Sequence, residues 1–447
     1  MVNKEKTHRK FKEKGGFELD LHMKREAIED SFTEVPPADE MRVFLRQQIG
    51  PEPEPLVEEG SSVAYGEKIG GIIEDDDWSV PVHSPVNGKV KEIKKMEHPI
   101  SEEEETAVII ETTDEKKEPF YEPMDPEEAS REDMLKRIRE AGVVGLGGAV
   151  CPTHGKLMEA KDRVSHLIIN AKESDPNVAC DVRLMIEKPK ELIDGIKLMG
   201  KILDVDNIVF ATRTKEGEIP DFERYLEGED IDVVRVRPNY SIGYGRLLVT
   251  EMLGGEVPHD KHSIDMGALV HNVGTAYAVS RAIRKGESLV SRGLTYYSKD
   301  EGGKNLWVRT GTPVEHILDF VGASITDFER VALGSIMMGP SVSDPSTPVL
   351  KAHAGVTGFT EDEKHPYEDQ TWCIRCGYCN TVCPVDIYPQ LIMKAQKKGK
   401  KKRLKKLNSD ACMDCGLCSF VCPARINFKP FLRRAKSEMW ESQRCET

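Results

Sequence analysis

The feature that most constrains this chain is a cysteine motif that occurs twice near its C-terminus. The first copy contains Cys373, Cys376, Cys379 and Cys383, and the second contains Cys412, Cys415, Cys418 and Cys422. Both copies read C-x2-C-x2-C-x3-C-P, the spacing that holds [4Fe-4S] clusters in proteins with two such clusters. Three thiolates at three-residue intervals can surround one iron cubane. The motif therefore predicts two clusters and a role in electron transfer.

The fourth cysteine of each copy is expected to serve the other cluster. This rule assigns one cluster to Cys373, Cys376, Cys379 and Cys422, and the second to Cys412, Cys415, Cys418 and Cys383. A zinc ribbon and a disulfide framework are the alternatives. Zinc sites usually need two C-x2-C pairs, not two four-cysteine runs that end in proline. We therefore favour iron–sulfur clusters.

Length and composition limit the remaining possibilities. The chain has 447 residues, which is enough for about three or four domains of ordinary size. Thiolate-bound clusters require a reducing compartment, and the charged N-terminus lacks the apolar core of a signal peptide. No apolar run approaches the ~18 residues that would suggest a membrane span. We expect a soluble protein, or one that is bound to a membrane through a partner.

The charge is unevenly distributed. The formal net charge is -14, yet the basic run Lys397–Lys406 lies between the two cysteine motifs. Three interpretations of this run are open: a solvated connector, a docking surface for an acidic partner, or a contact with anionic lipid. Nucleic acid is not expected as a partner, because the rest of the chain is acidic and the run lacks interleaved aromatic residues.

Residues 36–118 have the pattern of a small all-β unit, with short β-rich segments separated by turn signals. The segment Val80–Val90 resembles the hairpin of barrel-sandwich hybrid domains of the biotinyl or lipoyl type. The tip of that hairpin would be Val86, Asn87 and Gly88, with no lysine available for modification. We therefore predict a docking or spacer domain, in which His83 is a turn or packing residue.

The following region alternates between strand and helix patterns. A helix is expected to open at Pro126, and Gly142–Lys156 forms a glycine-rich loop. Such a loop can approach a phosphate closely, but many glycine-rich loops are plain turns. Strands are predicted at His166–Ile169, Asn207–Thr212 and Val233–Val236, with a helix at Pro189–Leu203.

A polar segment, Asn170–Pro176, directly follows the first of these strands. Ligands of doubly wound sheets bind beyond the carboxyl ends of the strands. Asn170 could offer both a donor and an acceptor to the edge of a ring. The alternative interpretation is a solvated polar loop.

Taken together, these motifs resemble those of a known family, the C subunits of Rnf-type ion-translocating ferredoxin oxidoreductase complexes. More distant relatives are the flavin-bearing subunit of complex I and the cobalamin reductase of propanediol-utilising microcompartments. The resemblance runs from about residue 40 to residue 435. It includes the motifs Asn272–Tyr277, Arg309–Pro313 and Met337–Gly339 in the family's order.

The resemblance implies an α/β multidomain chain. Its expected parts are an N-terminal arm (1–35), an all-β barrel-sandwich hybrid domain (36–118), a Rossmann-like FMN-binding α/β domain of the complex I flavin-subunit type (119–287), a β-grasp domain of the SLBB type (288–345), an α-helical ferredoxin-type domain with two [4Fe-4S] clusters (346–435) and a C-terminal tail (436–447).

The resemblance also implies a flavin site. Its cofactor-binding positions here are Gly145, Gly147, Gly148, Lys156, Asn170, Glu173 and Asn272, and further matches are Pro176, Asp181 and Arg183. In the family, the glycine loop holds the FMN phosphate and the loop that bears the asparagine faces the isoalloxazine ring. No catalytic residue is assigned.

Three positions depart from the family pattern. Cys151 stands where complex I relatives carry a phenylalanine that stacks on the NADH adenine, and Val150 adds a side chain where relatives have glycine. The third departure is the segment Tyr240–Arg246, in which Gly245 stands in place of an acidic residue that lies near the flavin and the nicotinamide.

Because two NADH-facing features are missing, NADH is not expected as a cofactor. Val150 and the segment 240–246 oppose FMN binding. The matching Asn170, Glu173 and Asn272 favour it, and we expect FMN to be bound.

The implied function is that of a peripheral electron-transfer subunit on the cytoplasmic face of the cell membrane. It would carry two [4Fe-4S] clusters and FMN, and would couple ferredoxin-linked electron transfer to ion translocation as part of an oxidoreductase. Its expected partners are the membrane subunits of the complex, together with ferredoxin or another acidic redox protein. The alternatives are a soluble reductase of the cobalamin-reductase type and a flavin-free relay or scaffold.

Overall fold

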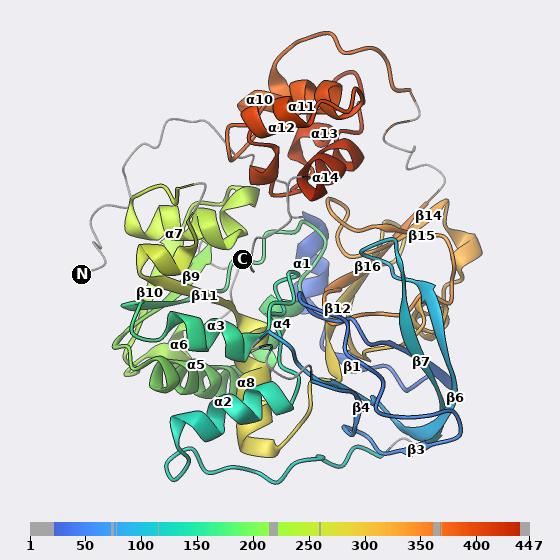
Figure 1. The fold of residues 1–447 in the computed structure, drawn as a ribbon, viewed down its shortest axis with the longest axis vertical. Coiled ribbons are helices and arrows are strands. Elements are labelled where there is room, and N and C mark those ends of the chain that lie inside the picture. Colours follow the sequence, from blue (N-terminus) through green and yellow to red (C-terminus); the bar gives the residue numbers. More distant parts are fainter. Residues whose placement is uncertain are drawn as a thin grey trace.

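Four structural parts follow one another along the chain (Figure 1). The computed structural model describes residues 22–72, 76, 78–114, 116–213, 222–258, 261–360, 367 and 369–438. The two β-rich parts lie beside the α/β part, and the helical C-terminal part (red) stands at one end of the molecule. The predicted arm is described only from residue 22 and the predicted tail only to residue 438.

The N-terminal part contains an antiparallel sheet in the order β2-β7-β6-β3. Its strands are β2 (Glu40–Phe44), β3 (Ser62–Val63), β6 (Asn87–Glu97) and β7 (Glu104–Asp114), and a separate pair consists of β4 (Lys68–Gly70) and β5 (Val82–His83). Alternating residues of β6 and β7 bury Val90, Val108 and Ile110 in one core.

The predicted hairpin tip between β5 and β6 is packed into this unit. The side-chain Oδ1 of Asn87 accepts a hydrogen bond from the Tyr65 backbone N–H at 2.8 Å, and Val86 is fully buried. His83 is also buried, with its Nε2 2.8 Å from the carbonyl oxygen of Glu140. These contacts hold the turn against neighbouring residues.

The α/β part contains a parallel sheet in the order β10-β9-β8-β11. Its strands are β8 (His166–Asn170), β9 (Asn207–Arg213), β10 (Ile231–Val236) and β11 (Ala268–Asn272). Its helices are α2 (Arg131–Glu140), α3 (Thr153–Ala160), α4 (Cys180–Glu187), α5 (Pro189–Leu203), α6 (Phe222–Leu226), α7 (Gly245–Leu253) and α8 (Val273–Lys285), with 3-10 turns η1 (Tyr240–Gly243) and η2 (Ser263–Met266).

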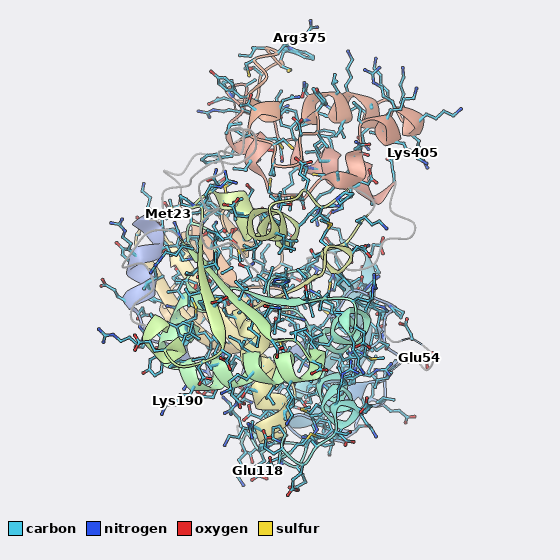
Figure 2. The ribbon with its side chains drawn as sticks, turned by 90° about the vertical axis from the view of Figure 1, so that its left-hand side faces the viewer. Met23, Glu54, Glu118, Lys190, Arg375 and Lys405 are labelled. Atoms are coloured by element: carbon cyan, nitrogen blue, oxygen red, sulfur yellow. The ribbon has the colours of Figure 1, made fainter. Side chains whose placement is uncertain are left out.

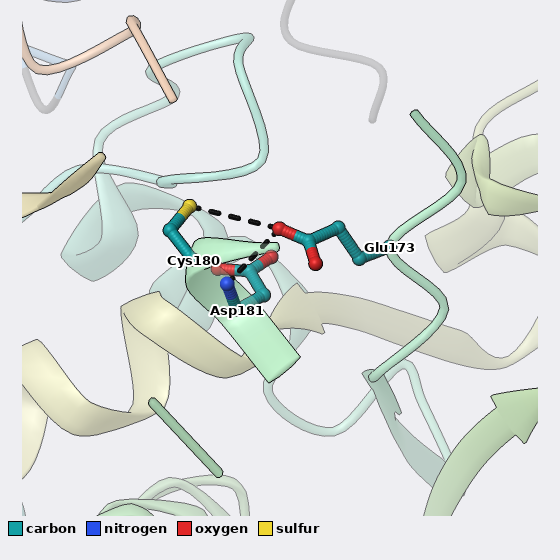
Figure 3. A group of neighbouring side chains, drawn as sticks. All are labelled: Glu173, Cys180 and Asp181. Carbon is teal, nitrogen blue, oxygen red and sulfur yellow. Dashed lines mark hydrogen bonds between the residues drawn. The ribbon is translucent and has the colours of Figure 1, made fainter. Parts of the chain in front are cut away.

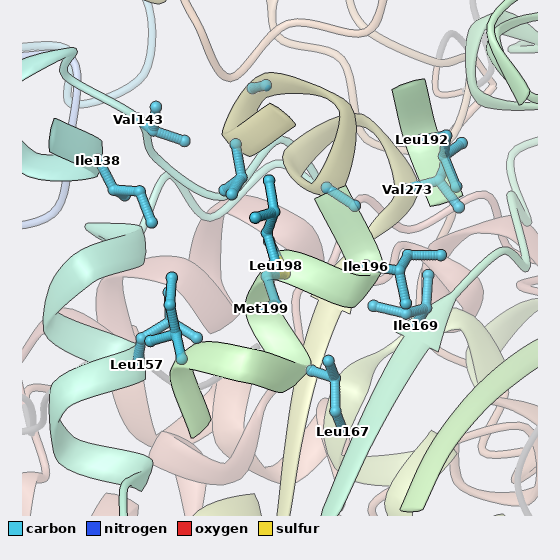
Figure 4. Packing of buried hydrophobic residues seen from close by; sticks show 14 of the residues in the cluster. Ile138, Val143, Leu157, Leu167, Ile169, Leu192, Ile196, Leu198, Met199 and Val273 are labelled. Atoms are coloured by element: carbon cyan, nitrogen blue, oxygen red, sulfur yellow. The ribbon is translucent and has the colours of Figure 1, made fainter. Parts of the chain in front are cut away.

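Because the strands are parallel, the loops after β8, β10 and β11 lie at one edge of this sheet. The sheet is held by an apolar core to which the strands and several helices contribute. Figure 4 shows part of this core, with Leu167 and Ile169 from β8 packed against α5 residues such as Ile196 and Met199.

Two predicted helices of this part have different outcomes. The helix expected at Pro189–Leu203 is confirmed with the same bounds. The helix expected to open at Pro126 begins instead at Arg131, so that prediction was wrong. The Ser130 side chain accepts a hydrogen bond from the Asp133 N–H, and Asp133 bonds back in a capping box that fixes the start of α2.

The next part is a mixed sheet in the order β1-β13-β12-β16-β14-β15. Its strands are β1 (Thr33–Glu34), β12 (Ser291–Ser298), β13 (Gly302–Arg309), β14 (Arg330–Leu333), β15 (Ser341–Val342) and β16 (Gly355–Phe359), with helix α9 (Val314–Val321) and the turn η3 (Ile325–Asp327). The hairpin, helix and mixed pairing are those of a β-grasp arrangement.

Two elements of this sheet come from outside the predicted range 288–345. The N-terminal segment supplies α1 (His22–Glu29) and β1, which pairs in parallel with β13. Strand β16 lies between β12 and β14, so the predicted boundary at residue 345 falls before a central strand. The sequence of β16 contains two glycines, Gly355 and Gly358, which weaken its strand signal.

The C-terminal part contains two similar halves. Its helices are α10 (Tyr378–Thr381), α11 (Pro389–Gln396), α12 (Lys401–Lys406), α13 (Leu417–Phe420) and α14 (Lys429–Ser437), with the turn η4 (Ser409–Ala411). In each half, a cysteine loop leads through a positive-φ glycine, Gly377 or Gly416, into a short helix. Across the described ranges, no helix combines the length and the apolar character needed to cross a bilayer.

Candidate cofactor sites

One predicted cysteine set surrounds a single small cavity. Its lining includes all four members of that set, Cys383, Cys412, Cys415 and Cys418. Three of these residues belong to the second motif and one to the first, as the pairing rule requires. Gly416 has a φ of 77°, which allows the loop to turn between Cys415 and Cys418. We call these four residues the inner set.

The other predicted set also gathers in space, and we call it the outer set. It consists of Cys373, Cys376, Cys379 and Cys422. Burial raises the pKa of the Cys379 thiol to about 11, and the three other members of the set raise it further. Cys379 and Cys422 also pack in one apolar cluster, so the two motifs meet at this set.

The chemistry of both sets suits iron–sulfur clusters. Burial raises the pKa of Cys412 to about 11 and that of Cys415 to about 12. Thiolates gathered this closely need cations to offset their charge, and the iron ions of a cluster supply that charge. The Sγ of Cys412 also accepts a hydrogen bond from the Asp414 N–H at 3.5 Å, a kind of contact that tunes cluster potential. Ligation by these cysteines stays a prediction.

The predicted flavin loop begins after α2 and is anchored at its base. The Gly145 N–H donates to the Cys151 carbonyl at 2.8 Å, and the Leu146 N–H donates to Thr275 Oγ1 at 2.9 Å. Gly148 has a φ of 102° and no atom within 4 Å of a built Cβ, so its backbone faces open space. A ligand could approach this glycine closely.

Val150 follows in the same loop with a φ of 47°, which is a strained value for a β-branched residue. Its side chain packs against the core of the α/β part. Gly147 lies against Asn272, whose Cβ is 3.4 Å from a Cβ built on the glycine. The loop therefore contacts β11 through Gly147, while Gly148 stays open.

Lys156 lies on α3, inside the α/β part. Its Nζ donates to the Val270 carbonyl at 2.8 Å, and burial lowers its pKa to about 8. The structure thus gives this lysine a backbone acceptor on β11. A contact with a flavin phosphate stays a prediction that rests on the resemblance.

Asn170 ends strand β8 and joins two loops at the carboxyl edge of the sheet. Its Nδ2 donates to the Gly243 carbonyl at 2.7 Å, and its Oδ1 accepts from the Lys172 N–H at 3.1 Å. The predicted ring-facing loop is therefore tied to the segment 240–246, which departs from the family pattern. Gly245, the third departure, is the first residue of α7.

Three predicted residues, Glu173, Asp181 and Asn272, form one hydrogen-bonded network. Figure 3 shows the Glu173 carboxylate pointing toward Cys180 and Asp181, at the start of α4. Glu173 Oε1 accepts from the Asp181 N–H at 3.0 Å, and Asp181 Oδ2 accepts from Asn272 Nδ2 at 2.6 Å. Burial, with Glu173 nearby, raises the pKa of Asp181 to about 7.

Asn272 has a second contact in this network, because its Oδ1 accepts from the Gly274 N–H at 2.8 Å and caps α8. The network thus connects the ends of β8 and β11 with the starts of α4 and α8. Of the additional matched residues, Pro176 is buried, and the Arg183 Nε donates to Glu187 at 2.6 Å.

A cavity of about 340 Å³ adjoins this network. Leu146, Asp181 and Gly274 line part of it, while β12 and β13 contribute Arg292 and Trp307. Its volume falls within the range of about 300–1,000 Å³ that is usual for cofactor sites. The glycine loop therefore borders, through Leu146, a cavity large enough for a small ligand, whereas none of the seven predicted cofactor-binding residues belongs to its lining.

The structure also brings two unpredicted lysines to the site. Lys24 of α1 lies 2.8 Å from Glu173 Oε2 and donates to the Glu173 carbonyl at 2.7 Å. Lys172 donates to Ser174 Oγ and to the Asn239 carbonyl, and burial, with Arg213 and Lys24 nearby, lowers its pKa to about 7. Lys172 could have been predicted as a site residue, because it lies in the loop directly after β8. No local sequence pattern marks Lys24 as a site residue.

A tyrosine pair connects the flavin-type edge with the inner cysteine set. Tyr240 is 2% exposed and forms one buried apolar cluster with Cys415 and Leu417, against which Tyr244 and Met337 pack. The Tyr244 hydroxyl lies 2.8 Å from the sulfur of Met338. Tyr244 is thus a packing residue between two parts of the molecule.

Comparison with protein-family models assigns three parts of the chain. Residues 11–115 match the RnfC barrel sandwich hybrid domain, residues 138–281 match the Nuo51 FMN-binding domain, and residues 372–426 match a 4Fe-4S dicluster domain. These matches confirm the predicted barrel-sandwich, flavin-type and dicluster parts of the fold, and they support FMN and [4Fe-4S] clusters as cofactors.

Curated relatives share much of the chain. It is 34% identical over 361 residues to the C subunit of the ion-translocating oxidoreductase complex of Serratia proteamaculans, across 79% of this chain and 51% of that protein. It is 32% identical over 366 residues to the C subunit of the proton-translocating ferredoxin:NAD(+) oxidoreductase complex of Clostridium ljungdahlii, across 80% of this chain and 78% of that protein. The chain spans about half the length of the Serratia protein and of several similar relatives.

Among solved structures, a chain of an NAD+-reducing [NiFe]-hydrogenase in its H2-reduced state is similar to this fold. The TM-score is 0.52 at 15% identity, covering 71% of this chain and 64% of the hydrogenase chain. A likeness at this identity concerns the fold alone.

Proposed function

Because this chain belongs to the family of C subunits of Rnf-type ion-translocating oxidoreductase complexes, we propose that it is the peripheral electron-transfer subunit of such a complex. It carries two [4Fe-4S] clusters and FMN, and it exchanges electrons with ferredoxin or another acidic redox protein. Its other partners are the membrane subunits, and it lies on the cytoplasmic face of the membrane.

The observation that carries this proposal is the contact between the flavin-type edge and the inner cysteine set. Tyr240 follows β10 at that edge and packs against Cys415. The Lys429 Nζ donates to the Met338 carbonyl at 2.5 Å, and Arg433 donates to the Ile100 carbonyl at 3.1 Å. These bonds support a fixed relation between the dicluster part and the remaining molecule, as an electron path requires.

The chain's own residues would position the flavin and exclude water from it. Gly148 leaves room for a phosphate, while Asn170 and the network of Glu173, Asp181 and Asn272 hold the surrounding loops in place. When bound, FMN supplies the conversion between one-electron and two-electron steps. Direct contacts between these residues and FMN are part of the proposal.

The residues at two NADH-facing positions, Cys151 and Gly245, favour a protein that does not react with NADH. Cys151 is 1% exposed, so it offers neither an aromatic face nor an accessible side chain to an adenine. Gly245, in the position of the family's acidic residue, has no side chain to meet a nicotinamide. The name of the Clostridium relative includes NAD(+), and that description belongs to that protein.

Cofactor analysis of anaerobically purified protein tests the proposal. We expect FMN, together with about eight iron atoms and eight acid-labile sulfides per chain. Zinc in place of iron would contradict the electron-transfer function, and iron without flavin would support the relay alternative. NADH should not reduce the flavin, whereas dithionite should.

A pair of asparagine variants tests the flavin edge. Asn170→Ala removes the side-chain amide at the carboxyl end of β8, which bonds to Gly243 in one loop and to Lys172 in another. Because both loops lose this hydrogen-bond partner, we expect FMN retention to fall by about tenfold or more. Asn207→Ala is the matched control, because Asn207 starts β9 at the opposite edge and bonds to Ser165. Equal FMN content in both variants would argue against this site.

A further inference from the structure

The two cysteine sets differ in how much of each is covered. Cys412 and Cys415 of the inner set are 7% and 9% exposed, and the contact with Tyr240 closes one side of that set. Cys373 and Cys376 of the outer set are both exposed. One predicted cluster therefore faces the flavin-type edge and the other faces outward.

The inner side is a tight fit. A Cβ built on Gly416 would lie 2.8 Å from the Met337 carbonyl, so the loop between Cys415 and Cys418 touches the β-grasp part through a bare backbone. On this side, the loop that carries the inner set is packed against other residues of the chain itself. A partner that exchanges electrons with the clusters is therefore expected at the outer side.

Large apolar side chains are exposed next to cysteines of the outer set. Trp372 is 93% exposed, Ile374 is 65% exposed and Tyr378 is 57% exposed, and all three lie within the first cysteine motif or next to it. Exposed aromatic residues grouped in this way mark sites of protein association. We call these three residues the apolar rim.

The dicluster part as a whole is strongly cationic. Between residues 369 and 438, fifteen Lys and Arg stand against five Asp and Glu, which gives a formal charge of +10 in a chain whose total is -14. Arg375 lies between the exposed cysteines, and Figure 2 shows it at the end of the dicluster part farthest from the α/β part, with Lys405 of α12 on the flank. The charge complement of this face is an acidic protein.

From the rim, its charge and the orientation of the two sets, we propose that Trp372, Ile374 and Tyr378 form the docking surface for an acidic ferredoxin, which exchanges electrons with the outer cluster. This inference rests on the proposed function. The cationic flank speeds the encounter, and the rim supplies the close, water-free contact that shortens the path to the cluster. One electron passes from the reduced ferredoxin to the outer cluster, then to the inner cluster and the flavin.

The test uses the full chain with reconstituted clusters and a chemically reduced, acidic ferredoxin with two [4Fe-4S] clusters. Stopped-flow absorbance measures the second-order rate of electron transfer. We expect Trp372→Ser to lower this rate about tenfold, because large aromatic residues dominate protein interfaces. Each of the three rim residues is next to a cysteine of the outer set along the chain, so Ile374→Ser and Tyr378→Ser provide independent variants beside Trp372→Ser. The EPR spectra and iron content of each variant establish that both clusters are intact.

Leu56→Ser is the matched control. Leu56 is 57% exposed, as Tyr378 is, but it lies in the N-terminal β-rich part. Its rate should stay within a factor of about two of wild type, as expected for a residue outside the interface. The rim variants should keep the salt dependence of wild type, since they change no charge.

Two results would overturn the inference. One is a wild-type rate in rim variants that retain both clusters. The other is loss of binding to the membrane subunits with an unchanged ferredoxin rate, which would assign the rim to another component of the complex. Failure of the proposed function looks different, because wild-type protein itself would then accept electrons from dithionite but not from ferredoxin.

Discussion

At the scale of single residues, two buried lysines have strongly lowered pKa values. Lys172 and Lys351 are 4% and 1% exposed, and burial is the main reason that their pKa values are lowered to about 7. A lysine whose pKa is lower in the folded state binds fewer protons there than in the unfolded state. Stability then rises with pH between the folded and unfolded pKa values.

The first prediction concerns this pH dependence. The stability of wild type should rise between about pH 7 and pH 10, because unfolded lysine has a pKa of about 10.4. Lys351→Met removes one of the groups responsible and should reduce the slope, measured by urea unfolding at several pH values. The exposed Lys190 gives the control variant Lys190→Met, whose slope should match wild type. Equal slopes in the two variants would contradict the assignment.

A second prediction compares a buried and an exposed ion pair. Lys24 and Glu173 pair at 2.8 Å with side chains 2% and 6% exposed, whereas Lys197 and Glu229 pair at 2.8 Å with side chains 57% and 32% exposed. Glu173→Gln removes the ion-pair partner of the buried Lys24 and leaves it only the backbone carbonyl, so we expect a loss of about 3–5 kcal/mol in unfolding free energy. Glu229→Gln should cost at most about 1 kcal/mol. Denaturant titration measures the unfolding free energy of both variants. Similar losses in the two would show that the buried pair stabilises the fold no more than the exposed pair does.

The residues of the site could be predicted only where a local pattern marked them. Asn170 and Glu173 follow the strand predicted at His166–Ile169, so their place at the carboxyl edge could be inferred from an α/β sheet. Asn272 was predicted only through the resemblance, because no strand was predicted at β11. Lys24 is different, because it lies 149 residues from Glu173 and belongs to no motif. Its role depends on how α1 packs, which no pattern near Lys24 describes.

At the scale of elements, prediction succeeded where apolar periodicity and end signals agreed. Helix α5 begins at Pro189 and has a continuous buried face, and both of its ends were predicted. The start of α2 was missed because Pro126 also fits a helix start, while the Ser130 capping box decides it. Strand β16 was not predicted, because its two glycines have low strand propensity. Its strand conformation is stabilised by pairing with β12 and β14.

Helix α12 forms the second half of the basic run Lys397–Lys406. Residues Lys401–Lys406 are helical, and Leu404 is fully buried while the charged residues of this helix are exposed. An apolar anchor in a basic helix indicates an ordered surface of fixed charge. An ordered charged surface can steer an acidic partner.

The third prediction concerns this steering. Lys401→Glu with Lys402→Glu should slow electron transfer from the acidic ferredoxin and weaken its dependence on salt, as measured by stopped flow at several ionic strengths. Lys136→Glu with Lys190→Glu changes the net charge by the same amount on the α/β part and should have a smaller effect. If both double variants respond alike, total charge and not α12 controls the rate.

At the scale of the whole molecule, the crossed cysteine pairing links the two halves of the dicluster part. Cys383 joins the inner set although it comes from the first motif, and Cys422 joins the outer set although it comes from the second. Each cluster would therefore bridge two segments separated by α11 and α12. Loss of one ligand should affect the cluster of the opposite motif.

The fourth prediction follows from this crossing. Cys383→Ser should remove the inner cluster, about four irons, and leave an outer cluster that ferredoxin still reduces while electron transfer to the flavin is lost. Cys422→Ser should do the reverse, so that ferredoxin no longer reduces the remaining cluster rapidly. Iron analysis and EPR distinguish the two variants. Retention of the inner cluster in Cys383→Ser would refute the crossed pairing.

The N-terminal strand has a consequence for how the chain matures on the ribosome. Thr33 of β1 pairs with Leu306 of β13, and Lys24 reaches Glu173. Residues 22–34 therefore leave the exit tunnel long before their partner strand has been translated. This early segment of the nascent polypeptide cannot pair until a segment about 270 residues later has been made, and the β-grasp sheet gains its edge strand β1 only at that point.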